Sequence, residues 1–305
     1  MSFPKWFQKN STQESVAAYT FLIPNLLGFL LFTSLPVAAS LILSFFRWDL
    51  LSPAHFVGAK NFVDLLSDPL FLKYCWNTLY MMIGIPISMA GSLLLAIAMN
   101  QKLKGIVFFR TVYFLPSICS GVAIFMTWRL MFNPEFGVVN SLIGKFGHLI
   151  GLTLEGPQWL TDEVWAKPAL IIVNVWQAIG GFNMMLYLAA LQGVPRDLYE
   201  AAEIDGATSW DKFWAVTWPQ ISPTTFYIAI MSVIGGFQGG FESAYMMTGG
   251  GPNGSTTTII YYLFNKAFTW NDMGYAAAIA WVLFIIVFTF TLIQWRSYGK
   301  NVHYT

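Results

Sequence analysis

The sequence predicts an all-α, polytopic membrane protein with about six transmembrane helices and one polar two-helix loop. The chain has 305 residues, of which 56% are hydrophobic and only 10% charged, whereas a soluble domain is usually about 25% charged. A spanning helix needs roughly 20 consecutive apolar residues, and six stretches reach that length. They are residues 18–46, 78–99, 111–131, 168–191, 224–247 and 275–294. We therefore expect residues 1–305 to form a single transmembrane domain.

The first apolar stretch, residues 18–46, is much longer than the core of a signal peptide, which has about 7–15 residues. No small-x-small cleavage site follows it. We expect this stretch to be retained as the first span.

The short loop between the second and third stretches is basic. It carries Lys102, Lys104 and Arg110 and no acidic residue. Short basic loops stay in the cytoplasm. Since six spans place both termini on one side, we expect both termini to be cytoplasmic. The longer connections, residues 47–77, 132–167 and 248–272, then lie outside.

Residues 194–223, here called the polar island, connect the fourth and fifth stretches. Its first half predicts a short helix, because Asp197 can cap a helix start and acidic side chains suit its partial positive charge. Gly206 can adopt the left-handed conformation that ends a helix.

The second half of the polar island predicts another short helix. Thr208 or Ser209 can cap it, and Pro219 is expected to stop it. Two short helices joined by a turn would then lie outside the bilayer. Ala201 and Ala202 form a small-residue patch that can lie in a groove of another protein. The alternative is that the island only caps two spans and packs on its own bundle.

Polar residues in the fourth and fifth stretches indicate a solute pathway, because amides in lipid are costly unless they are paired or face water. Asn174 and Gln177 lie three residues apart on one expected helix face. In the fifth stretch, Gln238, Glu242 and Tyr245 follow spacings of four and seven residues, so we expect them to share one helix face as well. The candidates are Asn174, Trp176, Gln177, Asn183, Gln238, Glu242 and Tyr245. Hydrogen bonding between helices is the alternative role.

Signatures of catalysis, metal binding and ion coupling are missing. The nearest approach to a phosphate-binding loop, residues 249–256, has Ser255 where the lysine is needed. Cys75 and Cys119 lie far apart in sequence, and adjacent Asp162 and Glu163 fit a solvated turn. We expect a transport subunit without a cofactor of its own, and any ATP hydrolysis on another chain.

The polar island resembles the EAA loop of ATP-binding-cassette importer permeases. Val216 and Trp218 depart from the usual Ile and Leu but stay apolar. Stretches 56–62, 109–116, 132–140 and 248–252 match further landmarks of the sugar-type permeases, in family order. The residues on the EAA pattern are Glu200, Ala201, Ala202, Asp205, Gly206, Ala207, Phe213, Pro219 and Pro223.

This resemblance implies one permease subunit of an ATP-driven, binding-protein-dependent importer in the inner membrane of a prokaryote. The implied partners are a second, homologous permease, two ATPase subunits that hold ATP and Mg²⁺, an extracytoplasmic solute-binding protein and membrane lipid, with no nucleic acid. Glu200 would supply the charged contact where the island docks into the ATPase. Residues 248–254 would meet the binding protein.

The implied cargo is a carbohydrate, and a neutral mono- or oligosaccharide fits best because no basic residue lies in the middle of a span. Glycerol-3-phosphate or a polyol is the alternative cargo. An ion-coupled carrier is a rival class, but His55, His148 and His303 all lie outside the expected spans. A membrane enzyme acting on lipid-linked sugars would need a recognisable set of acids and bases. Glu135, Asp162, Glu163 and Glu242 do not form one.

Overall fold

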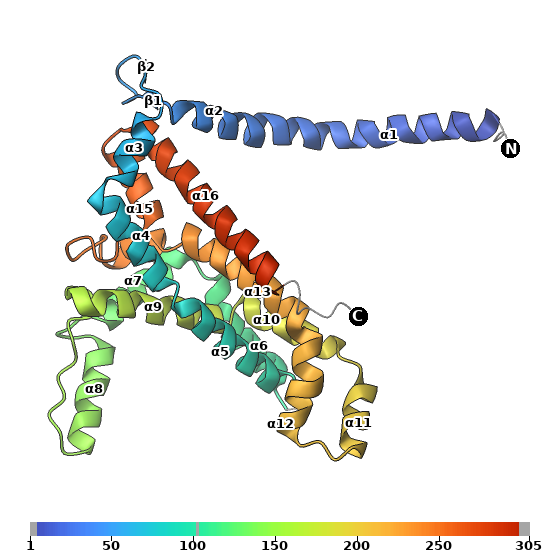
Figure 1. Cartoon of the computed structure of the whole chain (residues 1–305). Helices are drawn as coiled ribbons and strands as arrows, with labels where there is room; N and C mark the ends of the chain where they lie inside the picture. Colours follow the sequence, from blue (N-terminus) through green and yellow to red (C-terminus); the bar gives the residue numbers. More distant parts are fainter. Residues whose placement is uncertain (1–4, 102–103, 299–305) are drawn as a thin grey trace. The chain divides into compact units, whose positions relative to one another are not determined.

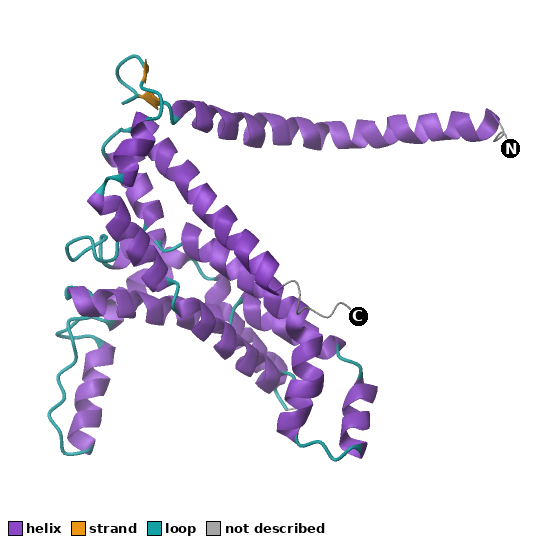
Figure 2. Ribbon diagram, in the orientation of Figure 1, coloured by secondary structure: helices purple, strands orange, loops and turns teal. Residues whose placement is uncertain are grey.

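The computed structural model describes residues 5–101 and 104–298, so Lys102 and His303 lie outside the described part (Figure 1). The regular secondary structure of the described residues is helical apart from one short hairpin, in which β1 (Phe46–Arg47) pairs with antiparallel β2 (His55–Phe56). This confirms the all-α class (Figure 2). The chain divides into two compact units. One comprises Met1–Leu65 with Lys266–Trp281, and the other Leu66–Asn265 with Val282–Thr305.

The first unit begins with one continuous helix, built from α1 (Lys5–Phe29), the π-helical turn η1 (Leu30–Ser34) and α2 (Leu35–Leu43). Residues Glu14–Leu43 are apolar and long enough to cross a membrane. Pro36 is the second residue after the π turn. The wider turn accommodates a residue that lacks an N–H and whose ring crowds the preceding turn.

Close packing joins the hairpin to its neighbours within the first unit. Asn61, in α3 (Lys60–Leu66), donates hydrogen bonds to the carbonyls of Ser44 and Phe46 at 2.8 and 2.9 Å. A Cβ on Gly274, near the start of α16 (Met273–Tyr298), would lie 1.8 Å from the Phe46 carbonyl oxygen. Only glycine fits there.

The second unit is centred on two long helix pairs. One consists of α4 (Pro69–Met81) and α5 (Gly84–Met99), the other of α9 (Glu163–Ile179) and α10 (Phe182–Gly193). Each pair together is long and apolar enough to cross a membrane as one span. The same is true of the single helical segment Met273–Ser297. A core of buried side chains joins α5, α10 and α13 (Trp218–Gln238). It includes Leu93, Met184, Tyr187, Leu191 and Ile228.

The third expected span, residues 111–131, is not straight. The helices α6 (Ile106–Ile118) and α7 (Gly121–Met131) meet at 96°. Cys119 and Ser120 between them have extended backbone, and Pro116 removes a hydrogen bond from the last turn of α6. The prediction of one continuous helix was wrong here.

The fifth expected span, residues 224–247, is also interrupted. Helix α13 ends at Gln238, and α14 (Phe241–Met247) begins after Gly240, whose φ is +80°. Within the described residues, four helices are long and apolar enough to cross a membrane, or five if α6 and α7 form one bent span. The six expected spans therefore correspond to the four long apolar helices, the bent pair α6–α7 and the broken pair α13–α14.

The remaining helices lie in the connections. They are α8 (Val138–Leu149), α11 (Arg196–Ile204), α12 (Ser209–Lys212), α15 (Ile259–Phe264) and two π-helical turns, η2 (Phe213–Thr217) and η3 (Asn265–Thr269). Figure 1 shows α8 beside the start of α9, whereas α11 follows the far end of α10. The two ends of the pair α9–α10 therefore carry different accessory elements.

Candidate functional site

The first helix of the polar island, α11, starts directly after Pro195 and makes no side-chain cap. Asp197 lies in its first turn instead of capping it, so that detail of the prediction was wrong. The end of α11 agrees with expectation. Gly206 has a φ of +78°, and the Ala207 amide donates to the Ala202 carbonyl at 2.9 Å. This is the Schellman arrangement that closes a helix on a left-handed glycine.

The second helix, α12, begins at a capping box. The Thr208 side chain accepts a hydrogen bond from the Asp211 amide at 3.3 Å, while the Asp211 carboxylate accepts one from the Thr208 amide at 2.9 Å. Hydrogen bonds from the Thr208 side chain and backbone lower the pKa of Asp211 below its usual 3.8. Of the two expected caps, Thr208 is therefore the one used.

The second helix does not stop at Pro219. Helix α12 continues through the π turn η2 into α13, so helical structure runs without a break from Ser209 to Gln238. Pro219 lies in the first turn of α13, where the wider π turn before it relieves the missing N–H and the crowding of the ring. The same arrangement occurs at Pro36.

One face of the polar island is fastened to the bundle. Lys212 Nζ lies 2.7 Å from Glu203 Oε1, which joins α12 to α11. The Tyr199 hydroxyl lies 2.9 Å from Thr217 Oγ1. Tyr199 and Phe213 also pack against the buried core shared by α5, α10 and α13. The inner face of the polar island is therefore packed directly on the membrane-spanning helices α5, α10 and α13.

The opposite face of the polar island is open. Glu200 and Ala201 are exposed, and Ile204 is 87% exposed. Trp210 is exposed as well. Apolar side chains left so open on a polar segment are typical of a surface that binds another protein. The island thus both packs on its own bundle and presents a free face.

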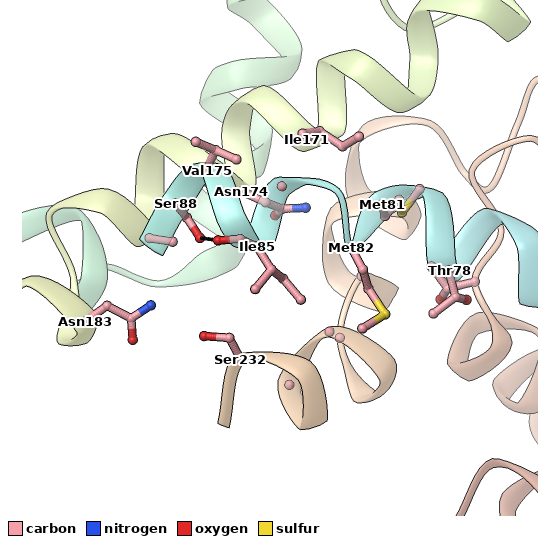
Figure 3. A pocket seen from close by; sticks show the side chains of 17 residues that line it. Thr78, Met81, Met82, Ile85, Ser88, Ile171, Asn174, Val175, Asn183 and Ser232 are labelled. Carbon is pink, nitrogen blue, oxygen red and sulfur yellow. Dashed lines mark hydrogen bonds between the residues drawn. The ribbon is translucent and has the colours of Figure 1, made fainter. Parts of the chain in front are cut away.

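A cavity of about 320 Å³ lies among α4, α5, α9, α10 and α13 (Figure 3). Its polar lining includes Asn174 and Asn183, both expected from the sequence. Thr78, Ser88 and Ser232 also line it and were not expected. Single hydroxyl residues within apolar stretches were the available signal for them. The apolar lining includes Met82 and Ile85, labelled in Figure 3, and Gly235 and Gly236 of α13 line the cavity as well.

The other candidates in the fourth span point elsewhere. The Gln177 amide donates to the Pro116 carbonyl at 3.5 Å, so it faces α6 and not the cavity that Asn174 lines. Trp176 packs edge-on against Trp128, with ring centroids 5.4 Å apart. Residues three apart on a helix differ enough in direction to meet different neighbours.

The fifth-span candidates do not share one continuous helix face, because the chain breaks after Gln238. Tyr245 stacks on Phe241 at 5.5 Å. Glu242 reaches the start of α7, since a Cβ on Gly121 would lie 2.6 Å from Glu242 Oε2. The structure therefore separates these three residues from the cavity.

The loop before α15 is fixed to α4. Asn77, which is only 1% exposed, donates its side-chain amide hydrogens to the carbonyls of Gly254 and Thr257 at 2.9 and 3.0 Å. The adjacent Thr78 hydroxyl accepts a hydrogen bond from the Ile259 amide at 3.0 Å. Helix α4 and the loop before α15, which are far apart in the sequence, thus form one local structure.

Among the described residues, no group of three or more His, Cys, Asp or Glu side chains could hold a metal ion. The two candidate site features are the open face of the polar island and the neutral cavity between helices.

Comparison with known proteins identifies the family. Residues 78–296 match the family described as "Binding-protein-dependent transport system inner membrane component". The chain is 38% identical over 295 residues to "Probable ABC transporter permease protein YurN" of Bacillus subtilis, covering 95% of this chain and 99% of that protein. It is 35% identical over 283 residues to "Arabinooligosaccharides transport system permease protein AraP" of Halalkalibacterium halodurans, covering 92% and 87%.

A third relative has a phosphorylated cargo in its name. The chain is 31% identical over 293 residues to "sn-glycerol-3-phosphate transport system permease protein UgpA" of Agrobacterium fabrum, covering 95% of this chain and 97% of that protein. A crystal structure of a bacterial ABC transporter involved in the import of alginate shares the fold, with a TM-score of 0.82, 24% identity, and coverage of 96% and 98%. This chain is therefore a member of the family of binding-protein-dependent transport system inner membrane components.

Proposed function

We propose that this chain is the permease subunit of an ATP-driven, binding-protein-dependent importer, and that it carries a carbohydrate across the inner membrane. The observation that supports this most directly is the two-sided polar island. Its inner face packs on the core of the membrane helices, and its outer face leaves Glu200, Ala201 and Ile204 open. That is what an element needs if it is to receive a movement and pass it on.

The ATPase subunits supply ATP hydrolysis and hold ATP and Mg²⁺, and this chain needs no cofactor of its own. On this proposal, α11 docks in a groove of one ATPase subunit through Glu200, Ala201, Ala202 and Ile204. Asp205, Gly206 and Ala207 form the turn that fixes α11 relative to α12. Movement then passes through Tyr199 to the bundle. A second permease and an extracytoplasmic solute-binding protein complete the importer.

The cavity lined by Asn174 and Asn183 is the part of the pathway that the permease itself forms. Amides and hydroxyls can donate and accept hydrogen bonds with sugar hydroxyls, and a volume of about 320 Å³ falls in the range of small-molecule sites, about 300–1,000 Å³. The roles of Trp176, Gln177, Gln238, Glu242 and Tyr245 in the pathway stay predictions. So do the cytoplasmic position of both termini and the single transmembrane domain.

Glycerol-3-phosphate, or a polyol, is the second candidate cargo, favoured by the name of the UgpA relative. A phosphate is normally bound by Arg or Lys. None of the residues that line the cavity is basic. The lining therefore favours a neutral carbohydrate over a phosphorylated one.

The test is ATP-dependent uptake by the reconstituted importer, with its partner permease, ATPase subunits and binding protein. Gly206→Pro should abolish uptake and solute-stimulated ATP hydrolysis, because proline cannot adopt a φ of +78°. Gly105→Pro is the matched control, since Gly105 also has a φ of +78° and open space around it but lies outside the island. It should keep the coupling between hydrolysis and uptake.

Three outcomes would contradict the proposal. Uptake that persists in Gly206→Pro would exclude the coupling role, and uptake without ATP would favour an ion-coupled carrier. For the cargo, labelled oligosaccharides and glycerol-3-phosphate should be compared in the same vesicles. Transport of glycerol-3-phosphate alone would overturn the assignment of a neutral carbohydrate.

A further inference from the structure

Helix α8 lies in the long connection between α7 and α9 and has two apolar faces. Val139 and Ile143 pack against a core cluster of the second unit. A second row, at spacings of four, eight and eleven residues, points away from that cluster. It consists of Val138, Leu142, Phe146 and Leu149.

This second row, here called the α8 strip, is open. Leu142 is 60% exposed, Phe146 59% and Leu149 82%. Val138, at the start of the helix, is exposed as well. Contiguous large apolar side chains on one helix face indicate a binding surface. Val139 and Ile143 pack against the core cluster from another face of α8, so the packed residues and the strip are different side chains.

A chain of contacts fixes the depth of α8 relative to the membrane. The Trp159 indole N–H donates to the Asn140 side-chain oxygen at 2.7 Å, and Asn140 belongs to α8. Trp159 packs edge-on against Trp165 with ring centroids 5.3 Å apart. Trp165 lies in the first turn of α9, where the span Glu163–Gly193 begins. Helix α8 is thus held at the level where a neighbouring helix enters the bilayer.

The charges around the α8 strip suit lipid headgroups. Lys145 borders the strip, His148 lies on the polar face, and both are exposed. Helix α8 itself contains no acidic residue. The acids of the adjoining segments, Glu135, Glu155 and Asp162, lie outside it. An amphipathic helix with an apolar row and a basic margin is suited to lie in the plane of a membrane surface with anionic lipid.

We infer that α8 is an interfacial helix, with the α8 strip inserted among the acyl chains at the membrane surface on the side opposite the polar island. Lys145 faces the lipid phosphates at the margin of the strip. The helix then holds the connection between α7 and α9 at the depth of the membrane surface. This inference does not depend on the identity of the cargo.

The test uses the complete importer in vesicles of phosphatidylethanolamine and phosphatidylglycerol. Single cysteines are introduced as Leu142→Cys and Phe146→Cys, in a background with Cys75→Ala and Cys119→Ala, and are labelled with an environment-sensitive fluorophore. His148→Cys is the matched control on the polar face of the same helix. Fluorescence is quenched separately by doxyl-labelled lipid and by aqueous iodide, and only preparations with ATP-dependent uptake are compared.

At positions 142 and 146 we expect doxyl-labelled lipid to cause the larger loss of fluorescence, and at position 148 iodide. Lys145→Glu should reduce the quenching by lipid at position 142, whereas Lys145→Arg should preserve it. Quenching by iodide at all three positions would place α8 in water and overturn the inference. Protection from both quenchers would show a protein over the strip instead. Iodide quenching that is lost when the binding protein is added would identify that protein as the occupant.

Discussion

Asn77 fixes the loop before α15, and its replacement should loosen that loop selectively. Asn77→Leu keeps nearly the same volume but removes both side-chain hydrogen bonds, to Gly254 and Thr257. The bond to Thr257 is buried and the bond to Gly254 partly buried. A buried carbonyl left without a donor costs about 1–3 kcal/mol, and an ordinary hydrogen bond contributes about 0.5–1.5 kcal/mol. The loop should therefore lose about 2–4 kcal/mol.

Native-state hydrogen exchange on the purified protein measures this loss directly, because exchange reports local opening. A change of about 2–4 kcal/mol corresponds to exchange faster by about 30- to 1000-fold. The informative amides are those of Ser255 and Ile259, which donate to Pro252 and Thr78. Amides elsewhere in the second unit, such as those of α10, should keep their rates.

Lys73→Met provides the control. Lys73 also donates to this loop, to the Asn253 carbonyl at 2.6 Å, but the bond is exposed. Its loss should change exchange by less than about tenfold, since exposed charged contacts contribute about 0–1 kcal/mol. If Asn77→Leu and Lys73→Met have equal effects, or if the Ser255 and Ile259 amides stay protected in Asn77→Leu, the buried amide does not hold the loop and the reasoning fails.

Three further predictions concern backbone conformation, packing and protonation. Gly206 has a positive φ and no atom within 4 Å of an added Cβ, so Gly206→Ala should lower the free energy of unfolding by about 1–2 kcal/mol from the backbone alone. Gly206→Asn should lower it less, and equal losses of stability for the two variants in thermal unfolding would contradict this. Gly236→Ala should lower the melting temperature, because its Cβ would lie 2.9 Å from Ile85 Cδ1, whereas Gly235→Ala, whose Cβ would have no atom within 4 Å, should leave it unchanged. A larger drop in melting temperature for Gly235→Ala than for Gly236→Ala would exclude the packing described here. The pKa of Asp211 is lowered by hydrogen bonds from Thr208, so the capping box should be fully formed above pH 3.8, the usual carboxyl pKa, and should be lost only as the pH falls through the lowered pKa of Asp211. Loss of amide protection at Thr208 near neutral pH would refute this.

The sequence was sufficient for the features that depend on local pattern. Apolar length identified the spans, and Thr208 was one of the two residues expected to cap the second helix of the polar island. Where the prediction failed, one residue type had two compatible roles. A glycine can lie within a helix or break it, and in the fifth expected span Gly240 adopts a φ of +80° between α13 and α14. Pro219 suits a helix end, but a π turn lets the helix continue through it.

The candidate site was predicted less completely, because a cavity depends on contacts between residues far apart in the chain. Asn174 was identified by its polarity within an apolar stretch, and it does line the cavity. Gln177 has the same polarity and nearly the same direction, yet it bonds to α6. The partnership of Asn77 with Gly254 spans 177 residues, and no local pattern in the sequence contains it.

The unbroken helix from Ser209 to Gln238 joins the polar island to one wall of the cavity in a single helical segment. At about 1.5 Å per residue, Ser209 and Gly235 lie about 40 Å apart along its axis. A tilt of about 5° at one end therefore sweeps the other end through about 3–4 Å, comparable to the diameter of a water molecule. Because η2 lies between the two ends, the stiffness of this π turn would set how much of such a rotation reaches the cavity wall.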